Sequence, residues 1–557
     1  MEPERKVDHE IDFDFTKLPP SQWGDYLLTV TINDSDLDAL AKKIEVLKPK
    51  VRDMLSLYSK DDDEETKRTV LFIHLLVSLG LAIHFENEIE HRLKVAFDNI
   101  EGLIADENDL YTISIMFRVF RTYGHNMSSD VFRRFKEDDG KFSRCLIEDF
   151  KGMLSFYEAL HFRTTTDNIL DEALSFTLSH LEPIAIGQLA SPAHISRLIQ
   201  KALHIPQRRN IEALVAREYI SFYEQEENHN DTLLKLAKLN FKFLQLHYFK
   251  ELQTITMWWR ELDHTLNFPA KFRERTIENW LSALMMYFEP QFSLGRIMSV
   301  KLYLAITFLD DACDSYASVE EVMNLVDCIE RWDPHYMGKL QVHMKTAFKL
   351  VMCVYKEYED VLSSQGRLFV MEEMIEEFKI IVRENVQFVK WARGDCIPSF
   401  DEYIKSGGAE IGSYATISST IMGLGEIAKK EDFKWLRSRP KVVQVLAAKA
   451  RLMDDITDFE EDIAKGYTAN ALNYYIKQYG VTKDEAIKEF YKMITDINKI
   501  VNEECLKTSH ISRRVLTQII NFGRLVDGLY TSDDVFNNRE GMLKEYIKTL
   551  LVDPIHL

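Results

Sequence analysis

Apolar residues recur at intervals of three and four along most of the chain, with acidic and other polar residues between them. The clearest stretches are 69–103, 209–224, 233–262, 273–288 and 342–360. This spacing places the apolar side chains on one face of an α-helix. No run of alternating apolar and polar residues is flanked by turn signals, so we predict no β-sheet. The pattern therefore predicts an all-α protein.

Two polar segments interrupt this pattern, KDDDEETK at 60–67 and EENHND at 226–231. We interpret both as loops. The second separates two long helical blocks, so we place a domain boundary near residue 230. This gives an amino-terminal helical domain over 1–230, without an active site of its own, and a carboxy-terminal domain over 231–557. No unit repeats at a fixed period, which argues against a solenoid of stacked repeats.

The composition agrees with a helical protein and excludes several classes. The 557 residues include only 21 Gly and 13 Pro, below the average shares of about 7% and 5%. Acidic residues outnumber basic ones by 89 to 69, so the net charge is −20. Because nucleic-acid binding relies on a basic surface, we expect no nucleic-acid partner. No uncharged apolar run is long enough to cross a membrane, so we also expect no membrane span.

The cysteines and the amino-terminal residues predict a cytoplasmic location. None of the six cysteines has C-x-x-C spacing, which is typical of reduced thiols in a cytosolic protein. The first residues, MEPERKVDHEIDFDF, are too acidic for an organelle transit peptide and have no apolar run for secretion. A plastid location would require a transit peptide ahead of this sequence.

The first segment with candidate chemistry is a mostly apolar run over 302–309 that leads directly into Asp310, Asp311 and Asp314. On a helix, Asp310 and Asp314 are four residues apart and project from one face. Their carboxylates repel each other when buried, and Mg²⁺ with oxygen ligands relieves that repulsion. A solvated helix end is the alternative interpretation. We apply it to the other adjacent acids of the chain, at 61–62, 138–139 and 533–534.

A second acidic segment, at 449–466, strengthens the metal interpretation. Asp454, Asp458 and Asp462 follow another apolar helical stretch at intervals of four, so they form one stripe along the helix. Such a stripe can hold Mg²⁺ while water and a phosphate complete the coordination. Two acidic stripes facing each other across a helical bundle would bind a polyanion through bridging metal ions.

Arginines accompany both acidic segments. Arg273 and Arg275 flank Glu274 in FRER at 272–275, and Arg451 precedes Asp454 by three residues. Arginine is suited to multidentate contact with phosphate. Lys465 follows Asp462 by three residues. The alternative for each of these basic residues is a surface ion pair, and we favour that alternative for Lys465.

Together these motifs resemble those of the plant class I terpene synthases. DDACD at 310–314 resembles the aspartate-rich motif of that family, DDITDFEED at 454–462 its second metal motif, and FRER its R-x-R motif. The resemblance extends over nearly the whole chain and is strongest to crucifer sesquiterpene synthases, including bisabolene synthases.

The resemblance implies a fold, a reaction and a set of site residues. The fold would be an amino-terminal relic α-barrel followed by a carboxy-terminal catalytic bundle. Three Mg²⁺ ions, replaceable by Mn²⁺, would bind the diphosphate of a prenyl diphosphate. The implied metal ligands are Asp310, Asp314, Asp454, Asp458 and Asp462. Arg273, Arg451 and the ligands Asp310, Asp314 and Asp454 would bind the substrate, and Asp311 would contact the site without binding metal. We expect a monomer that converts farnesyl diphosphate to a sesquiterpene.

The chain departs from the family pattern at three places. In the second metal motif, Asp458 stands where Ser or Thr is common and Asp462 stands where Glu is common. This more acidic motif also resembles the second motif of chain-elongating prenyltransferases. Ser282 stands where many relatives have a pocket Trp. Phe536 stands where some relatives have a Tyr beside a loop acid, here Asp534. We therefore assign the final proton to Tyr530 or to the released diphosphate.

The size of the pocket is open at this point. The candidate aromatic lining residues, each with plain core packing as the alternative, are Trp280, Tyr303, Phe308, Tyr414 and Tyr530. GGAEIGSY at 407–414 is either a loop or a helix break whose carbonyl groups face the cavity. The small residues here and at Ser282 would leave room for a substrate longer than fifteen carbons.

Three alternatives remain. The first is the same reaction on geranylgeranyl or geranylfarnesyl diphosphate. The second is a chain-elongating prenyltransferase, although such chains resemble only the carboxy-terminal half. The third is a non-catalytic acidic helical scaffold. The sequence contains no D-x-D-D, H-E-x-x-H, P-loop or G-x-G-x-x-G motif, so protonation-initiated cyclases, zinc proteases, P-loop enzymes and Rossmann dehydrogenases receive no support.

Overall fold

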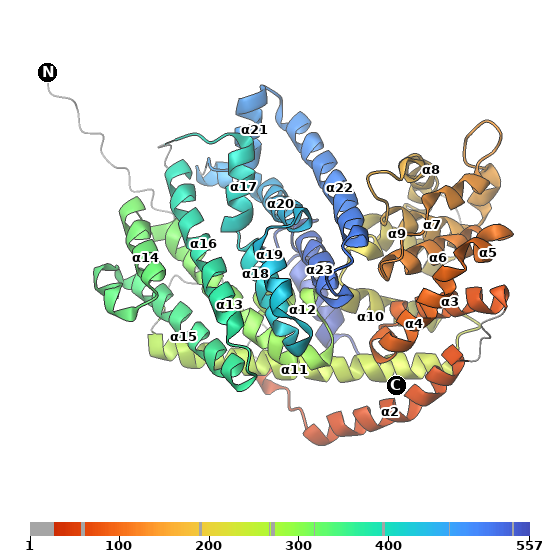
Figure 1. Ribbon diagram of the computed structural model, residues 1–557, viewed down its shortest axis with the longest axis horizontal. Helices are drawn as coiled ribbons and strands as arrows, with labels where there is room; N and C mark the ends of the chain where they lie inside the picture. Colours follow the sequence, from red (N-terminus) through yellow and green to blue (C-terminus); the bar gives the residue numbers. More distant parts are fainter. Residues whose placement is uncertain are drawn as a thin grey trace.

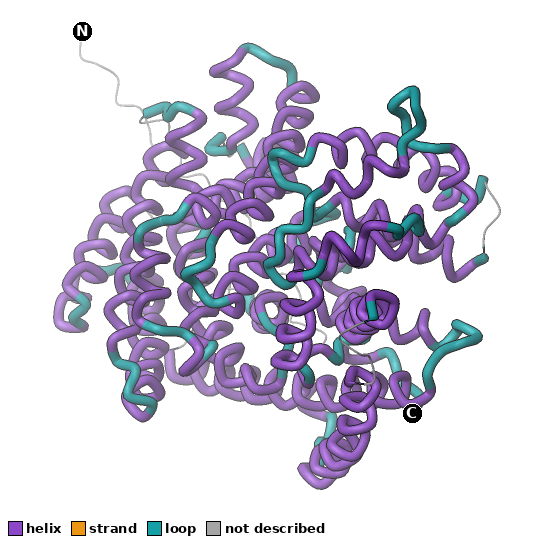
Figure 2. The backbone as a smooth tube through the Cα atoms, turned by 45° about the vertical axis from the view of Figure 1, so that its right-hand side comes forward, coloured by secondary structure: helices purple, strands orange, loops and turns teal. Residues whose placement is uncertain are grey.

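The computed structural model describes residues 27–56, 62–188, 192–266, 268, 273–316, 318–392, 396–466, 468–536, 538 and 540–557, without the side chains of residues 314–316 and 465. This described part is almost entirely helical, and short loops join its helices (Figure 2). Its only β-type pairing is one isolated antiparallel bridge between Lys136 and Phe142. The predicted all-α class is confirmed.

The amino-terminal helices are mostly short. They are α2 (Asp34–Ser56), α3 (Asp63–Ser78), α4 (Glu86–Asp98), α5 (Ile100–Ala105), α6 (Leu110–Thr122), α7 (Phe150–Leu160), α8 (Asn168–Ala185), α9 (Ala193–His204) and α10 (Glu212–Tyr223). Four 3₁₀ helices lie among them, η1 (Ala82–His84), η2 (Ser129–Phe135), η3 (Arg144–Glu148) and η4 (Gln207–Arg209).

The carboxy-terminal helices are longer. They are α11 (Asp231–Leu266), α12 (Thr276–Met286), α13 (Ser293–Tyr316), α14 (Val319–Arg331), α15 (Val342–Ser364), α16 (Phe369–Ala392), α17 (Phe400–Glu410), α18 (Ser413–Gly423), α19 (Lys430–Arg437), α20 (Lys441–Lys465), α21 (Ala471–Tyr479), α22 (Lys483–Lys507), α23 (Arg513–Tyr530) and α24 (Met542–Ile547). The short elements are η5 (Pro290–Phe292), η6 (Pro334–Lys339), η7 (Gly425–Ile427) and the π-helical turn η8 (Lys548–Val552).

The helices form two groups with a long helix beneath both. Figure 1 shows α3 to α10 on one side of the molecule and α12 to α23 on the other, while α11 runs along both groups. At 36 residues, α11 is about 54 Å long at 1.5 Å per residue. It packs against α2, α10, α12, α13 and α15. The same helix therefore supports both halves of the molecule.

The loop predicted at 60–67 is helical in part, so this prediction is partly wrong. Residues 63–67 form the first turn of α3, because the Asp62 side chain accepts hydrogen bonds from the backbone N–H groups of Glu64 and Glu65. Acidic residues are favourable at a helix amino terminus, so the run of acids begins a helix. Residues 57–61 lie outside the described residues. The other predicted loop is present, since α10 ends at Tyr223 and α11 begins at Asp231.

Helix α13 lies inside the carboxy-terminal group. It packs against α12, α15 and α18, and Val300, Leu302 and Leu304 are fully buried. The stretch Pro290–Cys313 is long and apolar enough to cross a membrane by length and composition, but 67% of its apolar window is buried inside the protein. We therefore identify α13 as the core helix of the bundle. Its last turns carry the first acidic motif.

Candidate active site

The two acidic motifs lie on helices of the same bundle. Asp310 lies in α13, and Asp454, Asp458 and Asp462 lie in the last turns of α20. Helices α12, α18 and α23 connect them, because α12 packs against α13 and α23, while α18 packs against α13, α20 and α23. Figure 1 shows these helices together in the centre of the carboxy-terminal group.

Asp310 and Asp454 lie within electrostatic range of each other. Burial and the neighbouring carboxylates of Asp311 and Asp454 together raise the pKa of Asp310 to about 6, against the opposing effect of the Arg275 and Arg451 cations. A carboxylate of α20 therefore destabilises the charged form of a carboxylate on α13. The two motifs, far apart in sequence, belong to one cluster of acids.

The stripe on α20 is more strongly perturbed. Burial, followed by the carboxylates of Asp454, Asp534 and Asp462, raises the pKa of Asp458 to about 9. Mutual repulsion of this kind is common at functional sites, where acids are held together for a ligand. Asp462 also accepts a hydrogen bond from Asn470 Nδ2 at 3.0 Å, which connects the stripe to the start of α21.

Asp455, the neighbour of Asp454, contacts the start of α21 and shares Arg451 with Asp454. Its Oδ2 accepts a hydrogen bond from the backbone N–H of Ala471 at 2.5 Å, and it is buried. Burial raises the pKa of Asp455 to about 7 against the opposing effect of the Arg451 cation. Asp455 therefore holds the start of α21 against α20.

The structure adds Asp534 to the cluster and corrects its interpretation as part of a solvated pair of acids. Asp534 is only 7% exposed. Burial and the Asp454 carboxylate together raise its pKa to about 7, against the lowering effects of the Phe536 N–H and the Arg275 and Arg273 cations. The residue lies in the loop after α23, where sequence spacing gives no periodic signal. The neighbouring Phe536, singled out above as a departure, was the available clue.

The arginines lie on both sides of this acidic cluster. Arg275 Nη1 forms an ion pair with Asp311 Oδ2 at 2.5 Å, and Arg273 Nη2 lies 3.4 Å from Glu278 Oε1. Arg451 contacts Asp454 and Asp455 and lies 3.3 Å from Glu410 Oε2. Because Arg451 is held by acids of the site itself, an incoming anion can take over its guanidinium only if these carboxylates gain another partner.

An apolar cavity opens beside the acidic cluster. Tyr530 lines both this cavity and the acidic cleft that contains Asp458 and Asp534. The cavity encloses about 550 Å³ of non-atom space, including its mouth. Its walls come from α12, α13, α18, α20, α23 and the loops beside them, through Asn279, Ser282, Tyr303, Ile306, Thr307, Ile411, Ser413, Thr416, Ala450, Phe522, Leu525, Val526, Leu529, Tyr530 and Phe536.

Only some of the candidate pocket residues line this cavity. Tyr303, Tyr530 and Ser282 do, and the Ser282 hydroxyl donates to the Glu278 carbonyl at 3.0 Å. The other three candidates are packed elsewhere. Trp280 lies against Tyr248 with its Nε1 3.3 Å from Glu251 Oε2, Phe308 packs on Phe268, and Tyr414 lies under the guanidinium of Arg439. Core packing is therefore the correct interpretation for Trp280 and Phe308, while Tyr414 is half-buried beside Arg439.

The helix break in 407–414 lies at Gly412. Gly407 and Gly408 are inside α17, while Gly412 adopts a left-handed φ of 79° between α17 and α18, a conformation that glycine reaches without strain. Ile411 and Ser413, on either side of the break, both line the cavity. The break therefore borders the cavity.

Tyr530 remains a neutral phenol in this environment. Burial raises its pKa well above the usual value, and the carboxylates of Asp454, Asp534 and Asp458 add to this effect. A phenol that keeps its proton can donate a hydrogen bond toward the cleft but is a poor proton acceptor.

The donor set fits a hard divalent cation held jointly with a ligand. Among the described side chains, no three His, Cys, Asp or Glu groups converge to surround a metal ion by themselves, and the side chain of Asp314 lies outside that set. Mg²⁺, however, is usually bound through one or two carboxylates and completed by water and phosphate oxygens. Oxygen-only, mutually repelling carboxylates on two helices match that chemistry.

Comparison with known proteins gives matches over the whole chain. The family profile described as "Terpene synthase, N-terminal domain" matches residues 22–203, and "Terpene synthase family, metal binding domain" matches residues 260–500. The chain is 69% identical to alpha-barbatene synthase of Arabidopsis thaliana and 57% identical to (Z)-gamma-bisabolene synthase 2 of the same plant, each over 100% of both chains. The structure of isoprene synthase from grey poplar leaves (Populus x canescens), in complex with three Mg²⁺ ions and dimethylallyl-S-thiolodiphosphate, is similar with a TM-score of 0.83 at 25% identity. That match covers 96% of this chain and 99% of the other.

Proposed function

The chain belongs to the terpene synthase family, and from that premise we propose that it is a sesquiterpene synthase. It ionises farnesyl diphosphate with Mg²⁺ and releases diphosphate together with a sesquiterpene of bisabolene type. The relatives that are 69% and 57% identical over their full length, named for alpha-barbatene and (Z)-gamma-bisabolene, support the sesquiterpene class. The observation that carries the proposal is the position of the acids on α13 and α20, within electrostatic range of each other at the mouth of an apolar cavity.

The metal would be held by residues from both helices. Asp310 and Asp314 on α13, and Asp454, Asp458 and Asp462 on α20, are the proposed ligands, with three Mg²⁺ ions as in the isoprene synthase complex. When bound, the ions supply Lewis-acid stabilisation of the negative charge on the departing diphosphate. We expect Mn²⁺ to replace Mg²⁺, because both prefer oxygen ligands.

The protein side chains perform the remaining tasks. Arg273 and Arg451 bind the diphosphate. Arg451 would become available when Asp454 leaves its guanidinium and contacts a metal ion instead. The C1–O bond of the substrate breaks with its electron pair leaving on the diphosphate. Charge stabilisation at that oxygen is the main catalytic effect. The hydrocarbon cation stays in the apolar cavity, whose walls exclude water.

The cation becomes an alkene when it loses a proton from carbon. We propose that the released diphosphate takes this proton, because it lies beside the cavity and is the strongest base formed in the reaction. Tyr530 lines both the cavity and the cleft, and its raised pKa keeps it a hydrogen-bond donor. Its role is then to hold the diphosphate by donating to an oxygen.

We also propose that the chain divides near residue 230, with the reaction confined to 231–557. The turn between Tyr223 and Asp231 supports this division. It falls between the amino-terminal profile, which ends at 203, and the metal-binding profile, which begins at 260.

A substrate panel tests this function. The protein is incubated with Mg²⁺ and the C10, C15, C20 or C25 prenyl diphosphate, and hydrocarbons and diphosphate are measured. We expect the highest kcat/KM with farnesyl diphosphate, no turnover in EDTA, and a kcat lower by about 100-fold or more in Asp310→Asn. A preference for C20 or C25 would overturn the C15 assignment. Consumption of added isopentenyl diphosphate would indicate chain elongation, and no turnover with any substrate would favour the scaffold.

A further inference from the structure

A cavity inside the amino-terminal group of helices lies apart from the candidate active site. It encloses about 290 Å³ and shares no lining residue with the active-site cavity. Most of its wall comes from α3, α6, α7, α9 and α10, which lie on one side of the molecule in Figure 1. Small-molecule sites usually enclose about 300–1,000 Å³, so this cavity has room for a small ligand.

Two ion pairs border the cavity where it reaches the surface. Lys201 of α9 pairs with Glu218 of α10, and Lys151 Nζ of α7 lies 2.8 Å from Glu226 Oε2, just after α10. All four side chains line the cavity and are partly exposed. A ligand can therefore reach the cavity between α10 and the opposite helices α7 and α9.

Arg118 of α6 lines the cavity as a buried cation without a carboxylate partner among the described residues. It is 8% exposed. Its hydrogen bond within this part of the chain runs from Nη2 to Gln207 Oε1 at 2.5 Å, and its buried Nε has no hydrogen-bond partner there. A buried cation is costly unless an anion accompanies it. The wall therefore presents a guanidinium that an anionic ligand would stabilise.

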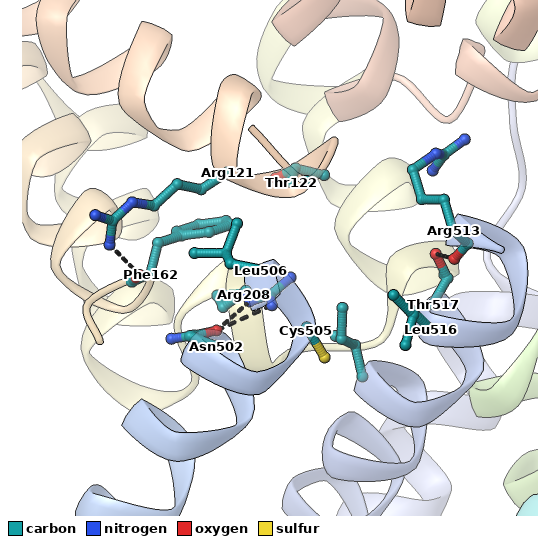
Figure 3. Close-up of a pocket in the computed structure, with 12 residues that line it drawn as sticks. Arg121, Thr122, Phe162, Arg208, Asn502, Cys505, Leu506, Arg513, Leu516 and Thr517 are labelled. Carbon is teal, nitrogen blue, oxygen red and sulfur yellow. Dashed lines mark hydrogen bonds between the residues drawn. The ribbon is translucent and has the colours of Figure 1, made fainter. Parts of the chain in front are cut away.

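The neighbouring arginines have partners of their own and do not line this cavity. Arg121, three residues after Arg118 in α6, donates to the Phe162 carbonyl at 2.9 Å. Arg208 donates from Nε and Nη2 to Asn502 Oδ1 at 3.2 and 2.9 Å. Figure 3 shows both sets of contacts in an adjoining pocket. Neither of these arginines competes with Arg118 for a ligand in the cavity.

Two tyrosines of the wall lie close to Arg118. Tyr111 of α6 and Tyr219 of α10 both act electrostatically on Arg118, and Tyr111 acts on Tyr219. Burial raises the pKa of both phenols, against the opposing effect of the Arg118 cation. Both therefore keep their protons at neutral pH and can donate hydrogen bonds. Three donors from two helices thus lie within electrostatic range of one another at one part of the cavity.

The other titratable groups beside Arg118 balance its charge only in part. Glu158 of α7 is the acid that acts most on Arg118. Burial raises the pKa of Glu158 to about 7, against the effects of Arg118 and the Gln207 N–H, so Glu158 carries only part of a charge at neutral pH. Burial and the Arg118 cation hold the pKa of His74 well below its usual value, so this histidine is neutral.

Apolar side chains form much of the remaining wall. Those of α3, α7 and α9 include Leu71, Leu75, Leu154, Ile195 and Leu198. A matching ligand therefore has a hydrocarbon part for this surface and a negative charge for the guanidinium. One partly balanced cation matches a single negative charge, which favours a monocarboxylate over a diphosphate.

We propose that this cavity binds a small apolar monocarboxylate. Its carboxylate accepts hydrogen bonds from the Arg118 guanidinium and from the Tyr111 and Tyr219 hydroxyl groups, and its hydrocarbon part packs on the apolar wall. Hydrogen bonds from arginine to a carboxylate are among the strong ones in proteins. The ligand is a straight-chain fatty acid or an isoprenoid acid. The proposal does not depend on the proposed reaction, since the two cavities share no lining residue.

Isothermal titration calorimetry of the full chain in EDTA tests the site. The probes are three compounds with the same number of carbons, sodium decanoate, sodium geranate and decan-1-ol. We expect saturable binding of at least one carboxylate near one per chain. The alcohol should bind at least about tenfold more weakly, because it forms no charge-assisted hydrogen bond with Arg118. Tighter binding of decanoate supports a fatty acid as the ligand, and tighter binding of geranate supports an isoprenoid acid.

Variants assign the binding to the cavity. Arg118→Gln should weaken the carboxylate affinity at least about tenfold, and Tyr219→Phe, which removes one neutral hydrogen bond, about two- to tenfold. Arg208→Gln is the matched control, because Arg208 is as buried as Arg118 but does not line this cavity. Its affinity, and that of the active-site variant Arg451→Gln, should stay within about twofold of wild type. Circular dichroism identifies a variant that fails to fold, and if Arg118→Gln does, Tyr219→Phe decides.

The proposal is overturned if neither carboxylate binds saturably, if decan-1-ol binds as tightly as the carboxylates, or if Arg118→Gln and Tyr219→Phe both bind as tightly as wild type. Loss of binding in a folded Arg451→Gln variant would place the carboxylate in the active site and would also overturn it. Product formation from farnesyl diphosphate with Mg²⁺ tests the proposed function separately, so failure of one leaves the other standing.

Discussion

Four buried or half-buried carboxyl groups on α13, α20 and the loop after α23 are held together against their own repulsion. Burial and neighbouring acids raise the pKa to about 6 for Asp310, about 7 for Asp455 and Asp534, and about 9 for Asp458. One pKa unit corresponds to about 1.4 kcal/mol between the protonated and charged forms. The arrangement is therefore unfavourable for the protein alone, and the proposed divalent cation would offset that cost.

Sequence spacing predicted part of this set of residues. The interval of four between Asp454, Asp458 and Asp462 fixed their common helix face, because helix geometry is local. Asp534 could not be found in this way, since its partner Asp454 is 80 positions away and its loop has no periodicity. The core positions of Trp280 and Phe308 were also beyond the pattern, which shows that a helical aromatic is buried but not what it faces.

Ser282 determines how much space the substrate has at the α12 wall. We expect Ser282→Trp to change the mixture of hydrocarbon products while the rate of diphosphate release stays within about threefold of wild type, because the residue lines the cavity and not the acidic cleft. A bulky ring in a packed wall shifts its neighbours at a cost of about 1–3 kcal/mol. Gas chromatography with mass spectrometry measures the products. An unchanged mixture would show that Ser282 does not shape the reaction.

Glu158 in α7 should make stability depend on pH. Its Oε2 accepts the Gln207 N–H at 2.9 Å, and burial raises its pKa from 4.5 to about 7. Its stabilising contribution is fully present below about pH 4.5 and is lost as the pH rises through about 7. Glu158→Gln keeps a hydrogen-bond acceptor but cannot ionise. We therefore expect the Tm of the variant, relative to wild type, to increase between about pH 5 and pH 8 in a fluorimetric melt. A constant or decreasing difference would contradict this.

At the scale of elements, the contact between α17 and α20 positions the acidic stripe. Gly407 and Gly408 lie in α17 where it crosses α20, and a Cβ added at Gly408 would lie 2.9 Å from the backbone carbon of Ala447. The two helices approach so closely only because this glycine has no side chain. Gly408 therefore fixes the distance of α17 from α20 at Ala447, which precedes Asp454 by seven residues.

Substitution at Gly408 tests this contact. Gly408→Ala should lower the Tm, since the added methyl group meets backbone rather than a flexible side chain, at a cost of about 1–3 kcal/mol. Gly338→Ala is the matched control, because its Cβ would meet no atom within 4 Å among the described residues. Thermal melts by circular dichroism compare the two. Equal Tm values would show that α17 and α20 can separate without loss.

The helices themselves were largely predictable, and their ends were not. Periodicity identifies the long helices because each has one buried face. The run of acids at 60–67 resembled a loop, but Asp62 caps α3 through the N–H groups of Glu64 and Glu65, a local arrangement that composition cannot reveal. The pair Gly407 and Gly408 resembled a break, yet both residues are helical because α20 lies against them. Only Gly412, with its positive φ, ends the helix.

For the molecule as a whole, a buried ionic group joins its two halves. Asp527 of α23 accepts hydrogen bonds from Arg209 of η4 at 3.0 and 2.7 Å and from Lys449 of α20 at 2.7 Å. Burial lowers the pKa of Lys449 to about 8, while Asp527 opposes this effect. The group therefore attaches the helix that carries the acidic stripe to both α23 and the amino-terminal half.

Neutralising the acid of this group tests its contribution to stability. Asp527→Asn leaves the buried Lys449 and the half-buried Arg209 without a carboxylate, and breaking a buried pair costs about 3–5 kcal/mol. We expect a clear decrease in Tm. Glu540→Gln, which removes an exposed pair with Lys544, should change it little. A melt of Asp527→Asn that coincides with wild type would show that the two halves are held together by other contacts.

The central claim is that the acids of α13 and α20 act as one magnesium-binding unit. The most direct measurement is diphosphate release from farnesyl diphosphate at saturating Mg²⁺ by wild type, Asp310→Asn, Asp454→Asn and the double variant. We expect each single variant to lose about 100-fold or more in kcat, and the double variant to be little worse than the weaker single variant, because residues that act as a unit are not additive. Losses that multiply, or a single variant with wild-type kcat, would contradict the account.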